Sequence, residues 1–143
     1  MSFLLDTCVV SELVRRHPNT RVLEWLEDQR ETDLFLSVLT FGELQKGIAR
    51  LPENSKRARL QAWTDQDLYD RFAGRVLDVN YEVASLAGKT QGAAESEGKK
   101  LPVIDSLIAA TAIHHQIVVV TRNVSDLTRC GAEVFNPWEE AES

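Results

Sequence analysis

The sequence has few of the features that mark secreted, membrane or fibrous proteins. Only two of its 143 residues are cysteines, and they form no Cys-x-x-Cys pair, so we expect reduced thiols rather than a disulfide framework. No apolar run approaches the ~20 residues of a membrane span, and the N-terminus has no basic flank followed by a signal-type core. Glycine and proline are sparse and scattered, which excludes linkers and low-complexity tracts. We therefore expect one cytoplasmic globular domain over residues 1–143, long enough to bury a sizeable core.

The charge balance gives no clear indication of the partner. A net charge of −6 argues against a nucleic acid, yet basic residues concentrate in one segment. Residues 46–59 contain five lysines and arginines against one acid, Glu53. A solvated helix face explains such a run as well as a nucleic-acid contact does.

Short apolar segments alternate with longer segments of helical periodicity. Strands are expected at 2–5, 34–37, 75–79, 117–121 and 133–135, and helices at 8–15, 20–29, 38–50, 54–72, 80–97 and 103–115. The segment IVVVT is continuous and β-branched, as in a central parallel strand covered on both faces. The alternation predicts an α/β fold with a parallel sheet.

Two acidic residues follow the first two predicted strands. Asp6 comes directly after the first strand, and Glu43 lies within two turns of the helix after the second. In open parallel sheets, chemistry gathers at the carboxyl ends of the strands. A structural role is open for both residues, because Asp6 suits a helix N-cap and the spacing from Thr40 to Glu43 fits a capping box.

Two more acids are expected at the same edge. Asp105 lies in the first turn of an apolar helix that has no Lys or Arg, although the helix dipole alone would also favour an acid there. That helix descends about 15 Å to His115 and the next strand climbs back about 16 Å, so Thr121 returns to the level of Asp105. The following loop then brings Asp126 to this edge, unless it serves only as a loop or cap residue.

Four close carboxylates cannot all remain ionised without help. Two like charges ~4 Å apart repel by about 4 kcal/mol at an effective dielectric constant near 20. Either some carboxylates are protonated or a cation neutralises them. Oxygen-only ligands suit Mg²⁺ or Mn²⁺ rather than zinc, and such an ion can activate water and stabilise a phosphodiester under attack.

Four sequence motifs carry a family resemblance. The combination of DTCVVSEL, FGELQKGI, LPVIDSLIAATA and VVVTRNVSDL resembles the PIN-domain ribonucleases, in particular the VapC/FitB-like toxins of type II toxin–antitoxin pairs. The resemblance spans nearly the whole chain, down to the closing NPW. It implies a three-layer α/β/α fold around a central parallel sheet of about five strands.

The resemblance also implies a site and a reaction. Asp6, Glu43, Asp105 and Asp126 match the acidic quartet that holds Mg²⁺ in this family. The implied reaction is Mg²⁺-dependent hydrolysis of RNA that leaves a 3′-hydroxyl and a 5′-phosphate. A small cognate antitoxin would be the silencing partner.

Polar neighbours of the acids are further candidates. We expect Ser106, Thr121 and Asn123 to orient carboxylates or waters. Lys46, three residues after Glu43, is placed either to contact a substrate phosphate or to pair with that glutamate. Cys8 lacks a candidate base, so we interpret it as core filling rather than as a nucleophile.

The apolar residues of helices 8–15 and 20–29, together with Trp63, exceed what a small core needs. We expect a protein-binding surface there, formed by residues such as Val14, Leu26 and Trp63. Its partner would be an antitoxin or a second copy of the chain, giving a homodimer or a toxin–antitoxin hetero-oligomer, with no membrane involved.

Two other functions remain open at this stage. A phosphoacceptor signalling domain is also an α/β sheet with acids at strand ends, and Asp78 would suit its phosphorylated position. Such domains need two adjacent acids after the first strand, where this chain has only Asp-Thr-Cys. A catalytically silent PIN-like binding module is the second alternative, but such modules typically lose acids, and here all four positions are filled.

Overall fold

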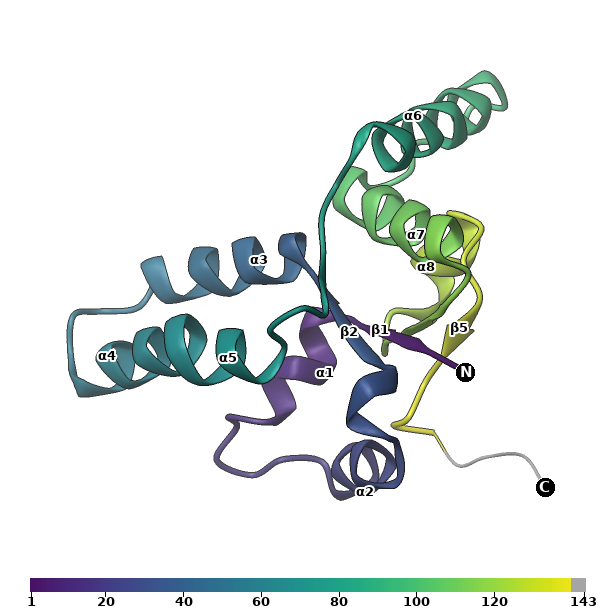
Figure 1. The fold of residues 1–143 in the computed structure, drawn as a ribbon. Coiled ribbons are helices and arrows are strands. Elements are labelled where there is room, and N and C mark those ends of the chain that lie inside the picture. The colour runs from purple at the N-terminus through teal and green to yellow at the C-terminus, as the bar shows by residue number, and fades with distance from the viewer. Residues whose placement is uncertain (140–143) are drawn as a thin grey trace.

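Five short apolar segments form one parallel sheet in the computed structural model of the chain, which describes residues 1–139 (Figure 1). The strands are β1 (Phe3–Leu5), β2 (Leu34–Ser37), β3 (Val76–Leu77), β4 (Val118–Val120) and β5 (Val134–Phe135). Their order is β3-β2-β1-β4-β5, and each neighbouring pair is parallel. The sequence-based expectation of a central parallel sheet of about five strands is confirmed.

The connections between strands are helical. The helical elements are α1 (Thr7–Glu12), α2 (Thr20–Asp28), the 3₁₀ turn η1 (Glu31–Asp33), α3 (Val38–Ala49), α4 (Ser55–Ala62), the π-helical segment η2 (Trp63–Leu68), α5 (Tyr69–Arg71), α6 (Tyr81–Ser96), α7 (Val103–His115) and α8 (Val124–Arg129). Helices α1, α2, α3, α4 and α6 begin at residues whose side chains accept a backbone N–H bond from the first turn, namely Asp6, Asn19, Ser37, Asn54 and Asn80.

Alternation along the strands divides the core into two layers. Leu5 and Val120 face one side of the sheet and pack with buried residues of α1, α2 and η2. Leu4 and Val119 face the other side and pack against α7 and α8. Helix α6 covers α7 through Val83 and Ala87. The result is the expected three-layer α/β/α arrangement (Figure 1).

Three features of the helices differ from the expectation. The predicted helix 8–15 ends at Glu12, and the Glu12 carboxylate accepts the Asn19 N–H from the loop that follows. The predicted helix 54–72 contains the π-helical segment η2. Helix α8 lies where a loop was expected, because six mostly polar residues show no apolar periodicity.

The strand order fixes where a site can form. The chain runs outward from β1 to β2 and β3, and then returns to the other side of β1 to form β4 and β5. In sheets of this kind, ligands bind outside the carboxyl ends of the strands, at the point where the order reverses. That point lies between β1 and β4. Among the helices of residues 1–139, none is both long and apolar enough to span a bilayer.

Candidate active site

Asp6 lies at the carboxyl end of β1, at the point where the strand order reverses. Its backbone N–H donates to the Val120 carbonyl oxygen (3.0 Å), which continues the pairing of β1 with β4. Its Oδ1 accepts a hydrogen bond from the Thr7 backbone N–H (2.9 Å) and its Oδ2 accepts one from the Thr121 hydroxyl (2.7 Å). Asp6 is therefore an N-cap, as its position suggested, and it is also held in one orientation from a neighbouring strand.

Thr121 connects the two strand ends. Its fully buried hydroxyl donates to Asp6 and accepts the Asn123 backbone N–H (2.9 Å). The Asn123 side chain in turn donates from Nδ2 to Asp105 Oδ2 at 3.4 Å. Two of the three polar neighbours named from the sequence therefore contact the predicted acids.

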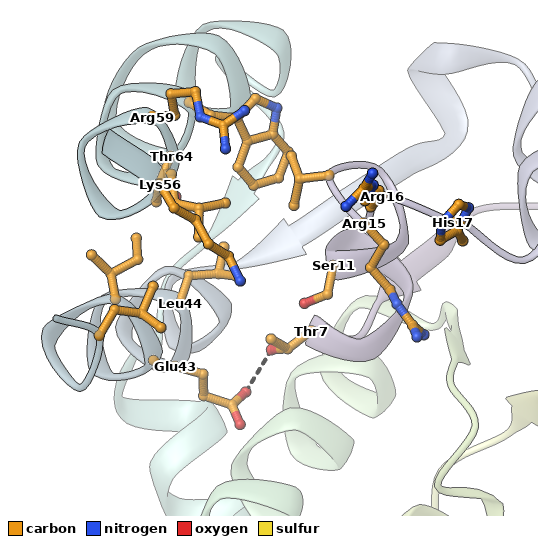
Figure 2. A pocket seen from close by; sticks show the side chains of 16 residues that line it. Thr7, Ser11, Arg15, Arg16, His17, Glu43, Leu44, Lys56, Arg59 and Thr64 are labelled. Carbon is orange, nitrogen blue, oxygen red and sulfur yellow. Dashed lines mark hydrogen bonds between the residues drawn. The ribbon is translucent and has the colours of Figure 1, made fainter. Parts of the chain in front are cut away.

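Glu43 reaches the same edge from α3. It is exposed, and its Oε1 accepts a hydrogen bond from the Thr7 hydroxyl at 2.7 Å (Figure 2). The capping-box interpretation is wrong, because the N-cap of α3 is Ser37, whose Oγ accepts the Leu39 N–H. Sequence reasoning missed Thr7, although a hydroxyl residue directly after a strand-terminal Asp was a usable signal.

Asp105 and Asp126 occupy the first turns of α7 and α8. Burial raises the pKa of Asp105 above its ordinary value of 3.8, and the negative charges of Asp6, Asp126 and Glu43 raise it further. All three other carboxylates thus lie close enough to act on Asp105. Asp126 also forms an ion pair with Arg129, an exposed neighbour on α8.

The comparison with known families gives the site a context. The PIN-domain family model matches residues 3–129. The chain belongs to the PIN-domain family. This PIN domain is 37% identical to the toxin FitB of Neisseria gonorrhoeae over 96% of the chain and 99% of the relative. It is 35% identical to the VapC ribonuclease Y4jK of Sinorhizobium fredii, over the same shares of the two chains.

Solved structures give the same result. This PIN domain matches a chain of FitAB bound to a DNA fragment with a TM-score of 0.90, at 36% identity and over 98% of both chains. A chain of VapBC2 from Rickettsia felis matches with a TM-score of 0.76 at 22% identity, covering 95% of this chain and 98% of that chain, and this supports the fold alone.

The carboxylate oxygens of the four acids are the ligand type that Mg²⁺ prefers, but they do not form a complete set of ligands around one point. Over residues 1–139, no group of three His, Cys, Asp or Glu side chains is arranged closely enough to hold a metal ion by itself. Mg²⁺ does not require such a group, because it usually keeps several waters and binds through one or two carboxylates. Burial is the largest cause of the raised pKa of Asp105, and the negative charges of the other three acids come next; a divalent cation would relieve that part.

Two predicted site residues form no hydrogen bond or ion pair with the acids among the described residues. The Ser106 hydroxyl is buried and donates to the Pro102 carbonyl oxygen of its own helix (2.7 Å), so it does not orient a carboxylate. Lys46 is exposed, and within the described residues it forms no ion pair with Glu43. Burial raises the pKa of the Cys8 thiol, with a contribution from Asp6, which agrees with a structural rather than a nucleophilic cysteine.

A cleft of about 1120 Å³ opens beside the acids. Thr7 and Glu43 lie at its edge, and Val14 and Trp63 line it while staying half-buried. The expectation that Leu26 belongs to an exposed protein-binding surface is wrong, because this residue is buried in the core under α2.

Proposed function

We propose that this PIN domain is an Mg²⁺-dependent endoribonuclease toxin that hydrolyses RNA phosphodiester bonds. One observation supports the proposal: Asp6, Glu43 and Asp126, from separate parts of the chain, all lie near enough to Asp105 for their charges to raise its pKa, beside the strand-order reversal of a PIN fold. A phosphoacceptor domain fits less well, because Asp78 follows β3, which is an edge strand rather than a middle one.

In this proposal the carboxylates divide their tasks by position. Asp6 and Asp105 would hold Mg²⁺, with Glu43 and Asp126 contributing directly or through water. When bound there, the ion supplies Lewis-acid activation of water and neutralises phosphate charge. Thr121 fixes the rotamer of Asp6, and Asn123 steadies Asp105. The Thr7 hydroxyl donates to the Glu43 carboxylate and so holds this side chain, which extends from α3, beside the end of β1.

We propose a cognate antitoxin as the regulatory partner. Its support is the likeness to the toxin FitB and to a chain of FitAB bound to DNA. A catalytically silent binding module is not favoured, since all four acidic positions are filled and each makes a defined contact or charge interaction.

The proposal is tested with antitoxin-free protein and structured RNAs. We expect cleavage in Mg²⁺ or Mn²⁺, no cleavage with EDTA, and product ends that carry a 5′-phosphate and a 3′-hydroxyl. Adapter ligation that requires a 5′-phosphate identifies the ends. Cleavage that persists in EDTA, or that leaves a 2′,3′-cyclic phosphate, would contradict the metal-assisted mechanism.

Removal of the Thr121 hydroxyl tests whether this group orients the Asp6 carboxylate or only contributes to packing. Thr121→Val is expected to cost about 1–2 kcal/mol in the free energy of unfolding, because it leaves the Asn123 N–H without its acceptor. RNA cleavage should fall by roughly 10- to 100-fold, since Asp6 loses the donor that orients it.

The matched control is Thr111→Val. Thr111 is equally buried, but its hydroxyl donates to the Leu107 carbonyl oxygen within α7, away from the acids. This variant should keep its cleavage rate. Equal losses of activity in the two variants would show that Thr121 has no specific positioning role.

A further inference from the structure

The cleft beside the acids is positively charged in a protein whose net charge is negative. Figure 2 shows Lys56 and Arg59 on one wall of the cleft, Arg16 and His17 on the opposite wall, and Glu43 at one end. Among the residues that the structure describes, Glu43 is the one acid that lines it. Within residues 1–139, the side chains of Arg16, Lys56 and Arg59 form no ion pair.

The first wall is one face of a helix. Lys56, Arg59, Leu60 and Trp63 follow one another at helical spacing, so their side chains lie along a single line over α4 and the start of η2. A polar network fixes this wall to α3. The Gln61 Nε2 donates to Gln45 Oε1 (2.8 Å) and to Asp65 Oδ2 (2.9 Å).

The opposite wall is the loop that follows α1. The buried Glu12 carboxylate accepts hydrogen bonds from Arg15 Nη1 (2.8 Å) and from the Asn19 backbone N–H (3.0 Å). These bonds hold both ends of segment 15–19, so Arg16 and His17 stay beside the cleft instead of folding away from it. Hydrogen bonds to other parts of the fold thus hold both cationic walls in place.

We propose that this cleft binds a single strand of RNA and delivers it to the acidic site, with Lys56, Arg59 and Arg16 as phosphate-binding residues. The inference rests on the proposed ribonuclease function. Cationic side chains on both walls suit phosphates, and Leu60 and Trp63 on the first wall offer apolar surface to the faces of unpaired bases. Thr7 and Glu43 line both the cleft and the site, so a strand that lies in the cleft is continuous with the carboxylates.

The main test removes two cations from one wall. We expect the double variant Lys56→Ala/Arg59→Ala to raise KM for a cleaved RNA about tenfold at 0.1 M salt, with kcat nearly unchanged. The slope of log affinity against log salt should become shallower by about 0.7 for each cation removed. The control Lys89→Ala/Lys100→Ala removes the same charge from exposed positions outside the cleft and should change neither quantity.

A second variant blocks the cleft without changing its charge. Gly47 lines the cleft, and a Cβ atom added there meets no heavy atom within 4 Å. Gly47→Leu should therefore fold and weaken RNA binding while leaving the salt slope as it is. Gly88→Leu, at an exposed and equally open helical position of α6, is its control.

Binding is measured separately from cleavage, by fluorescence anisotropy of a fluorescein-labelled oligouridylate in EDTA. Binding that depends on Lys56 and Arg59, without any cleavage in Mg²⁺, would leave the cleft inference standing and overturn the proposed function. Cleavage with an unchanged KM in the cleft variants would overturn the cleft inference alone. Unchanged RNA binding together with lost binding of the cognate antitoxin would reassign the cleft to an acidic protein segment.

Discussion

Asp105→Asn is expected to lower RNA cleavage by about 100-fold or more while leaving the fold intact. The substitution keeps the volume of the side chain and removes one negative charge from the acidic edge. Cleavage falls because metal-assisted attack depends on correct placement of the ion, for which Asp105 is a proposed ligand. Rates of RNA cleavage in saturating Mg²⁺ measure this loss.

The stability of the same variant should move in the opposite direction. Burial and the neighbouring acids raise the pKa of Asp105 in the folded protein above its ordinary value of 3.8. The folded state therefore disfavours the ionised carboxylate, and stability is lost as the pH rises through the raised pKa. Asp105→Asn should match the wild type below about pH 4 and melt at an equal or higher temperature at pH 7 without Mg²⁺.

Glu82→Gln is the control that distinguishes relief of charge repulsion at Asp105 from loss of an interaction with the helix dipole. Glu82 is an exposed acid in the first turn of α6, so its neutral variant loses only a dipole interaction, worth at most about 1 kcal/mol. Added Mg²⁺ should raise the melting temperature of the wild type and of Glu82→Gln, but not of Asp105→Asn. An active Asp105→Asn protein that melts at a lower temperature would make Asp105 a capping residue.

Glu12→Ala is expected to lower the free energy of unfolding by about 3 kcal/mol, the largest loss of stability that we predict. Glu12 is only 1% exposed, and its carboxylate accepts a charge-assisted hydrogen bond from the Asn19 N–H. The alanine variant loses that bond, leaves the N–H without its acceptor and opens a space under α1. Urea denaturation measures the loss.

Two variants identify which bond matters. Glu12→Gln keeps an acceptor for Asn19 and should cost about 1 kcal/mol. Arg15→Ala removes a salt bridge whose arginine side chain is 57% exposed, so it should cost less than about 1 kcal/mol. If Arg15→Ala cost as much as Glu12→Ala, the ion pair rather than the backbone bond would hold this segment.

The sequence was sufficient to predict the elements that bury apolar side chains. Helix α7 and strands β2 and β4 stand within a residue of their expected bounds, because continuous apolar runs leave little choice of structure. The lengths of α7 and β4 also placed Thr121 at the level of the acids, where its hydroxyl does meet Asp6.

Features that depend on contacts between distant segments could not be predicted in this way. The hydrogen bond from Thr7 to Glu43 requires the packing of α3 beside α1, which no local pattern encodes. Ser106 was misplaced because a helical serine can donate to the carbonyl oxygen four residues earlier, as it does here to Pro102. The cleft depends on how α4 sits against α3, and therefore on the network around Gln45.

The central position of β1 has a consequence for protein synthesis. Its strand partner β4 and the hydroxyl that orients Asp6 both come from residues 118–121, late in the chain. A nascent chain that has not yet released this segment from the ribosome has an unpaired β1 edge and a freely rotating Asp6. The Asp6 carboxylate therefore reaches the orientation described above only after residues 118–121 have left the ribosome and paired with β1.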